Sequence, residues 1–158
     1  MLIINNKEFA EQHQSINDTI DIATLERVQD LFDELSGSIS FTITGDMDNT
    51  NRAVLNVAIY GKITSLCQNC LEKMEIILEH TAVLPIFDNE SDLDDALFSE
   101  ESTESDGLIA DLEFDVLNFI EDEIIILLPL APKHGNCKQS SHKNDSSNPF
   151  GVLKQLLN

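Results

Sequence analysis

The sequence predicts an α+β domain built on an antiparallel β meander, with helices before and after it in the chain. Apolar and polar residues alternate in three successive segments, residues 39–44, 55–63 and 74–86, which are joined by turn-rich links. Such alternation is typical of strands with one buried face, and short links favour antiparallel pairing. Apolar residues recur every three to four positions in residues 24–35 and 116–128, which predicts amphipathic helices.

The chain has 158 residues, of which 42% are hydrophobic and 24% charged, so we expect a single domain over residues 1–158 that needs no disulfide. Its first eight residues lack the basic start and long apolar stretch of a signal peptide, and no apolar run is long enough to span a membrane. Three cysteines are an odd number. Together these features predict a cytoplasmic protein with reduced thiols and no membrane partner.

Local signals define the elements around the three strands. Residues 19–23 are expected as a short strand, with Thr24 as the cap of the first helix and Gly37 as its end. Gly61 lies inside the second strand and indicates a bulge or a close approach of two backbones. The third strand places His80 on its apolar face, where we expect a core or edge histidine rather than a metal ligand.

The second half of the chain alternates between polar and apolar segments. Residues 88–107 are acidic and serine-rich, and we expect them to form a mobile loop with a short turn around Leu93 and Leu97-Phe98. Residues 108–114 alternate as a fourth strand, and Asp115 is expected to cap the helix that follows. A polar connector over residues 133–147 then leads to a short terminal helix over residues 148–157.

The net charge of −20 restricts the partners that the chain attracts. Residues 74–132 contain no lysine or arginine, whereas a generic binder of phosphate backbones is expected to carry a basic patch. An acidic surface attracts cationic partners, ribosomal proteins among them, although the same charge also serves solubility alone. Lys133, Lys138 and Lys143 make the C-terminal segment locally basic and are the candidate contacts to RNA or to a partner. A polar connector without a binding role is the alternative.

Cys67, Cys70, His134 and Cys137 are the candidate metal ligands. Two residues separate the members of each pair, so one turn can aim both side chains at the same point. Thiolate and imidazole donors in a four-coordinate cage are typical of structural zinc. Two other interpretations stay open, namely three reduced thiols without a metal and a redox-active Cys67–Cys70 pair. Redox pairs of the thioredoxin type open a helix, whereas this pair lies between two predicted strands.

The sequence carries no motif of a known catalytic site, such as Gly-x-Ser-x-Gly or a phosphate-binding Gly-rich loop. Several carboxylates near the predicted helices are expected to be caps or solvated side chains. These carboxylates are Asp21, Asp111, Asp115, Glu121, Asp122 and Glu123. We therefore expect no catalytic residue and no enzymatic activity.

From about residue 39 onward, a series of short motifs stands in a characteristic order. They are residues 59–63 leading into 67–72, Asp111-Leu112, Glu123, residues 128–134 with Cys137, and residues 148–153. In this order and spacing the chain resembles the bacterial YceD family, the large ribosomal RNA subunit accumulation proteins. The family usually has Cys-x-Arg-Cys, and Asn69 stands here in place of the arginine. If that arginine contacts phosphate or a partner carboxylate in the family, the contact is missing here.

The resemblance implies a role in the accumulation and maturation of 23S ribosomal RNA, and it offers no catalytic residues to carry over. We expect a non-enzymatic ribosome-biogenesis factor that acts through a large-subunit precursor or a ribosomal protein and touches ribosomal RNA indirectly or weakly. One alternative is a protein that binds ribosomal RNA directly through the Cys67–Cys70 turn and the basic C-terminal segment. A second alternative is an RNA-processing hydrolase.

Overall fold

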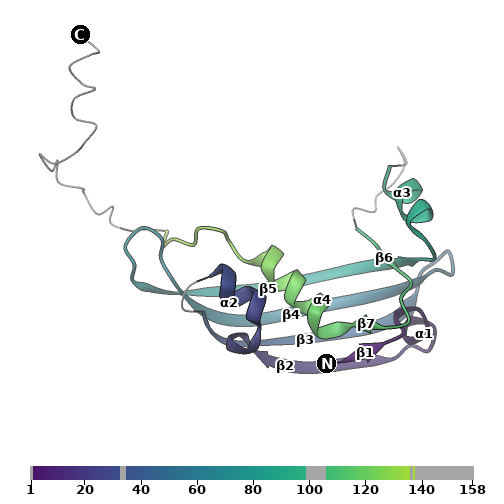
Figure 1. The fold of residues 1–158 in the computed structure, drawn as a ribbon, viewed down its shortest axis with the longest axis horizontal. Coiled ribbons are helices and arrows are strands. Elements are labelled where there is room, and N and C mark those ends of the chain that lie inside the picture. The colour runs from purple at the N-terminus through teal and green to yellow at the C-terminus, as the bar shows by residue number, and fades with distance from the viewer. Residues whose placement is uncertain (1, 33–34, 99–105, 136, 138–158) are drawn as a thin grey trace, which may run out of the picture.

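A mainly antiparallel sheet forms the centre of the computed structural model, which describes residues 2–32, 35–98, 106–135 and 137. Its meander consists of β2 (Ser15–Asp21), β3 (Ser36–Met47), β4 (Ala53–Leu66) and β5 (Lys73–Phe87), in that order (Figure 1). The short strand β6 (Leu108–Ile109) pairs in parallel with the end of β5 and completes a five-stranded sheet. The predicted α+β class and the meander are therefore confirmed.

The register of the meander follows the predicted alternation. Pairing of β3 with β4 and of β4 with β5 is continuous, so each strand keeps one set of side chains on the same face. Ile39, Phe41 and Ile43 of β3 lie on the buried face. A Cβ atom at Gly61 would lie 2.8 Å from the carbonyl oxygen of Ser38, so the glycine marks a close approach of β3 and β4 rather than a bulge.

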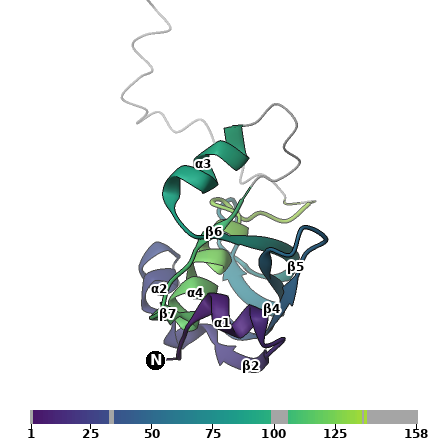
Figure 2. The ribbon, with the colours of Figure 1, turned by 90° about the vertical axis from the view of Figure 1, so that its right-hand side faces the viewer.

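Helices cover one face of this sheet (Figures 1 and 2). They are α1 (Asn6–Glu11), the 3-10 helix η1 (Ile22–Thr24), α2 (Glu26–Leu31) and α4 (Val116–Leu127). Val116, Ile120 and Ile124 of α4 are fully buried in the core. Asp115 caps α4 as predicted, because its carboxylate accepts the N–H groups of Leu117 and Asn118. The opposite face of the sheet bears exposed side chains, which include Tyr60 and Glu79.

The N-terminal segment was not predicted. Its strand β1 (Ile3–Ile4) pairs with β7 (Phe114–Asp115), and α1 packs on β3. The fully buried Asn6 connects α1 to the segment between β6 and β7, because its side chain donates to the carbonyl oxygen of Ile109 and accepts the N–H group of Asp111, both at 2.9 Å.

Several predicted elements differ from the structure. The predicted fourth strand over residues 108–114 is wrong, since β6 and β7 are separate strands with different partners. The predicted loop over residues 88–107 contains α3 (Glu90–Phe98), a helix without a buried residue. The first helix is shorter than predicted because Phe32 is already extended, with φ −134°. Thr24 does not cap it, and Gly37 lies in β3.

Other predictions fall on the rest of the chain. The terminal helix at residues 148–157 and most of the polar connector at residues 133–147 lie outside the described residues. None of the helices that the structure describes is long and apolar enough to cross a membrane.

Candidate metal centre

The turn between β4 and β5 holds the first two candidate ligands. The N–H group of Cys67 donates to Glu72 O at 2.9 Å, and the N–H group of Leu71 donates to Cys67 O at 2.9 Å. Leu71 adopts a left-handed conformation with φ 61°, which reverses the chain within a few residues. The N–H group of Asn69 lies 3.5 Å from Cys67 Sγ. The turn is therefore closed by backbone hydrogen bonds, with Cys67 fully buried and Cys70 half-buried.

The segment after α4 brings the other two candidate ligands to this turn. Pro132 O accepts the N–H group of Gln68 at 2.8 Å, which ties the returning chain to the hairpin. A second turn follows, in which the N–H group of Cys137 donates to His134 O at 3.3 Å. His134 and Cys137 are half-buried. Two turns that are far apart in the sequence therefore face each other.

The four donor atoms lie close enough together to bind one metal ion. Cys67 Sγ lies 3.6 Å from Cys137 Sγ, and Cys70 Sγ lies 3.4 Å from His134 Nδ1. All four donor atoms lie within 4.8 Å of one another. Zinc–sulfur bonds of about 2.3 Å at tetrahedral angles place two sulfurs about 3.8 Å apart, whereas a disulfide requires about 2.05 Å. The three cysteines are free, and the four side chains can hold one metal ion.

The surroundings give the two hairpin thiols different acidities. Burial raises the pKa of Cys67, but the N–H groups of Cys70, Asn69 and His134 outweigh it and lower the pKa to about 6. The N–H group of Glu72 lowers the pKa of Cys70, but burial and the sulfurs of Cys137 and Cys67 together raise it to about 11. One thiolate is thus favoured at neutral pH, and further negative charge in the cluster is opposed. A cation would relieve that opposition.

Among the other histidine and lysine candidates of the sequence analysis, the structure describes His80 and Lys133. His80 is half-buried on the inner face of β5, and its Nε2 lies 3.6 Å from Glu123 Oε2. Burial raises the pKa of Glu123, against the favourable charge of His80. Lys133 is exposed next to His134. Lys138 and Lys143 lie outside the described residues.

The carboxylates named from the sequence have structural partners. Asp21 caps η1 through the N–H group of Ala23, and Asp111 accepts the N–H group of Glu113. Glu121 differs from its prediction as a solvated side chain or cap, since it is buried and bonded to Arg27 of α2. Nothing in the local sequence signals that pair, because its members are 94 positions apart.

Residues 55–157 match the family model described as "Large ribosomal RNA subunit accumulation protein YceD". All four candidate ligands fall within the matched range. No curated protein and no solved structure gives a significant match to the chain.

Proposed function

Because the chain belongs to the YceD family, we propose that it is a non-enzymatic factor that supports processing or accumulation of 23S ribosomal RNA through a protein partner. The observation that carries the proposal is the family match, which extends from β4 beyond α4. The description of that family names the accumulation of the large ribosomal RNA subunit. The proposed mode of action rests on the charge and contacts of the described residues.

The charge distribution supports a cationic protein partner rather than naked RNA. The net charge is −20, and residues 74–132 contain no lysine or arginine. A pocket of about 530 Å³ between β2 and α4 is lined by Asp18, Asp21 and Asp115, among other residues. Such a surface attracts basic proteins and repels a phosphate backbone. A basic ribosomal protein of the large subunit has the required positive charge. A large-subunit precursor that exposes such a protein has it too.

The roles of the carboxylates support a function without catalysis. Asp21, Asp111 and Asp115 each accept a backbone N–H group, and Glu121 is bonded to Arg27. These hydrogen bonds give each carboxylate a structural role at a helix end, a turn or a contact between helices.

Direct contact with ribosomal RNA is the second candidate function. Lys133 is exposed beside the candidate metal centre, and an RNA that binds there would meet the Cys67–Cys70 turn. Titration of RNA binding against salt separates the two candidates. A steep loss of affinity with salt supports direct phosphate contact, whereas co-purification with ribosomal proteins and no binding of naked RNA supports the protein partner. RNA degradation by the pure protein, abolished by one carboxylate substitution, would support the hydrolase alternative.

We propose zinc as the metal, because three thiolates and one imidazole form a donor set that zinc favours. Bound zinc would hold the β4–β5 turn to the segment that follows α4. Its proposed role is structural, since four protein ligands leave no open coordination position.

The experiment that tests the proposed function is depletion of the protein followed by sedimentation of ribosomal particles. We expect the ratio of large to small subunits to fall and 23S precursors to rise, and the unaltered chain to restore both. An unchanged ratio after complete depletion would overturn the proposal.

A further inference from the structure

The outer edge of β5 is long and almost unpaired by described residues. β5 extends over 15 residues, and its pairing with β4 involves Lys73 to Pro85. On its other side, β6 pairs only with Ile86 and Phe87. Within the described part of the chain, no strand pairs with the outer edge between Lys73 and Pro85. An edge of this kind is a template for an added strand.

Hydrogen bonds at the two borders of the sheet show which groups of β5 point outward. Phe87 O accepts the N–H group of Ala110 on the β6 side, so Phe87 faces away from β4. At the opposite border, the N–H group of Gly45 donates to Gln14 O at 2.9 Å. In a strand, the N–H and C=O groups of successive residues point alternately to its two sides. Following the continuous registers from either border assigns the same residues of β5 to the outward side. The residues with outward N–H and C=O groups are Glu75, Ile77, Glu79, Thr81 and Val83.

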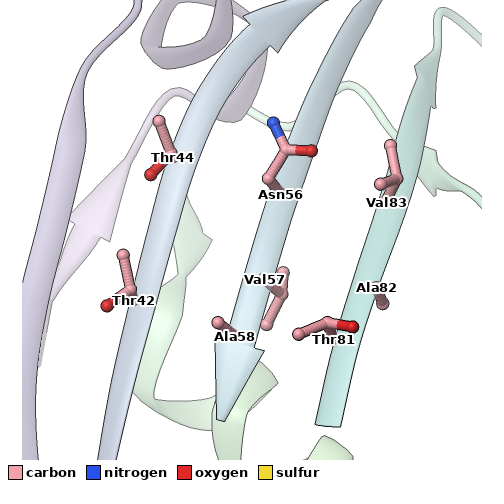
Figure 3. Close-up of a pocket in the computed structure, with 8 residues that line it drawn as sticks. All are labelled: Thr42, Thr44, Asn56, Val57, Ala58, Thr81, Ala82 and Val83. Carbon is pink, nitrogen blue, oxygen red and sulfur yellow. The ribbon is translucent and has the colours of Figure 1, made fainter.

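The side chains of these five residues lie on the open face of the sheet, and all are exposed. Ile77 is 58% and Val83 is 64% exposed. Thr81 and Val83 also line a shallow pocket of about 260 Å³ that continues over Asn56 and Ala58 of β4 (Figure 3). A strand added to the edge would place alternate side chains beside this apolar surface.

The charge around the edge selects a basic strand. Glu75 and Glu79 are exposed on it, and Glu123 lies under its centre beside His80. Lys73 at its start and Lys62, which pairs with Glu75, are the cations near its first half. At its far end Arg52 stacks on the ring of Phe87, and Lys7 pairs with Asp88. Beyond Lys73 no lysine or arginine occurs before Lys133. A second copy of this chain would bring the same glutamates together and is therefore disfavoured.

We infer that the outer edge of β5 binds an extended, basic segment of a partner protein by strand addition. The inference rests on the proposed function for the cationic nature of the partner, and it specifies where and how that partner binds. Main-chain hydrogen bonds to the outward groups provide affinity, while Glu75, Glu79, Ile77 and Val83 on the open face select basic and apolar side chains at every second position of the added strand.

The test uses the purified full chain and a labelled peptide of about eight residues, in which lysine and valine alternate at every second position with threonine between them, so that both face the open side of the sheet. At about 3.3 Å per residue the peptide spans most of the edge. We expect the peptide to slow amide hydrogen exchange at Ile77, Glu79 and Thr81. The amides of Leu78 and His80 already face β4 and serve as internal references. Unchanged exchange at the outward amides under saturating peptide would overturn the inference.

Peptides and variants separate strand addition from attraction by charge. A peptide of the same sequence with N-methyl groups on alternate amides keeps the charge but loses donors, and we expect about tenfold weaker binding for the form methylated on the pairing side. Thr81→Pro removes one outward N–H group, so it should weaken the binding of the unmethylated parent peptide. The pairing of β5 with β4 should be unchanged, because that N–H group points away from β4. Equal affinity for the methylated and parent peptides contradicts strand addition whether or not Thr81→Pro folds.

A matched pair of double variants tests the position of the charge. The first double variant combines Glu75→Gln and Glu79→Gln on β5. The second combines Asp94→Asn and Asp95→Asn on α3 and changes the net charge by the same amount. We expect only the first to weaken peptide binding severalfold, and equal effects contradict the inference. Protection of the outward amides by protein concentration alone, or by RNA and not by the peptide, would also overturn it. Peptide binding is measured with the pure protein, whereas the ratio of ribosomal subunits is measured in cells. A failure of strand addition can therefore be distinguished from a failure of the proposed function.

Discussion

Glu121 of α4 accepts two hydrogen bonds from Arg27 of α2, one from its backbone N–H group at 2.8 Å and one from Nε at 3.1 Å. The same guanidinium donates to Asn118 O at 2.9 Å and contacts Asp122 at 2.5 Å. Glu121 is 9% exposed, whereas Asp122 is exposed. Two helices are thus joined by one buried and one exposed carboxylate.

Glu121→Ala is expected to lower the free energy of unfolding by about 1–3 kcal/mol, because it leaves the N–H groups of Arg27 and Val28 without their acceptor. Asp122→Ala is the matched control and should cost about 0–1 kcal/mol, as is usual for an exposed ion pair. Urea denaturation measures both. Equal losses would show that burial of Glu121 has no energetic consequence.

Gly45→Ala is expected to destabilise the fold by about 1–3 kcal/mol through overpacking. A Cβ atom at Gly45 would lie 2.5 Å from Phe9 O, so β3 and α1 would have to separate. At Gly135 a Cβ atom would meet no heavy atom within 4 Å, and Gly135→Ala should change the stability of the metal-free protein by less than about 0.5 kcal/mol. Thermal unfolding of both variants in the presence of a chelator is the measurement, and a neutral Gly45→Ala would contradict the packing of α1.

Cys70→Ser is expected to abolish stoichiometric zinc in protein prepared under zinc-replete, reducing conditions, because it removes one thiolate donor. Asn69→Ala lies in the same turn and lacks a ligand atom, so it should retain zinc. Metal analysis of the purified proteins decides this. Absence of zinc from the unaltered chain would refute the assignment, and equal retention by Cys70→Ser would exclude Cys70 as a ligand.

Asp48 links acid stability to the β3–β4 turn. Its pKa is lowered chiefly by the backbone N–H group of Arg52, against the effect of burial, with further hydrogen bonds from Thr50. Since the folded pKa lies below 3.8, the contribution to stability is present above that pH and is lost as pH falls through the folded value. Carboxyl NMR titration should give a lowered pKa for Asp48, and Thr50→Ala should bring it closer to the ordinary value. An ordinary pKa in the unaltered chain would contradict these hydrogen bonds.

The strands and α4 could be predicted because their signals are local. Ile39, Phe41 and Ile43 alternate, and Asp115 is a capping residue directly before a helical pattern. The helix α1 has only 6 residues, and its position depends on the contact of Phe9 and Ala10 with Gly45. The helix α3 has no fully buried residue, and its apolar spacing is limited to Leu93, Ala96 and Leu97, a weak signal within an acidic segment. Asn89, which accepts the N–H group of Asp92, is the local signal that could have identified its start.

The candidate site could be predicted only in part. The spacing of Cys67 with Cys70 and of His134 with Cys137 predicts two turns that each aim two donors. Their meeting depends on the course of α4 and on the hydrogen bond from Gln68 to Pro132, which neither pair encodes. The outer edge of β5 was not predicted either, because an unpaired edge depends on the positions of all the other strands.

The two pairs of candidate ligands join distant parts of the chain, since Cys70 and His134 are 64 positions apart. A metal ion held by both pairs closes a loop that contains β5, α3, β6, β7 and α4. In the chain-entropy treatment of cross-links, closing a loop of this length disfavours the unfolded chain by about 4 kcal/mol. A metal ion bound at the candidate site would therefore act as a removable cross-link, and the stability of the fold would depend on the supply of that metal.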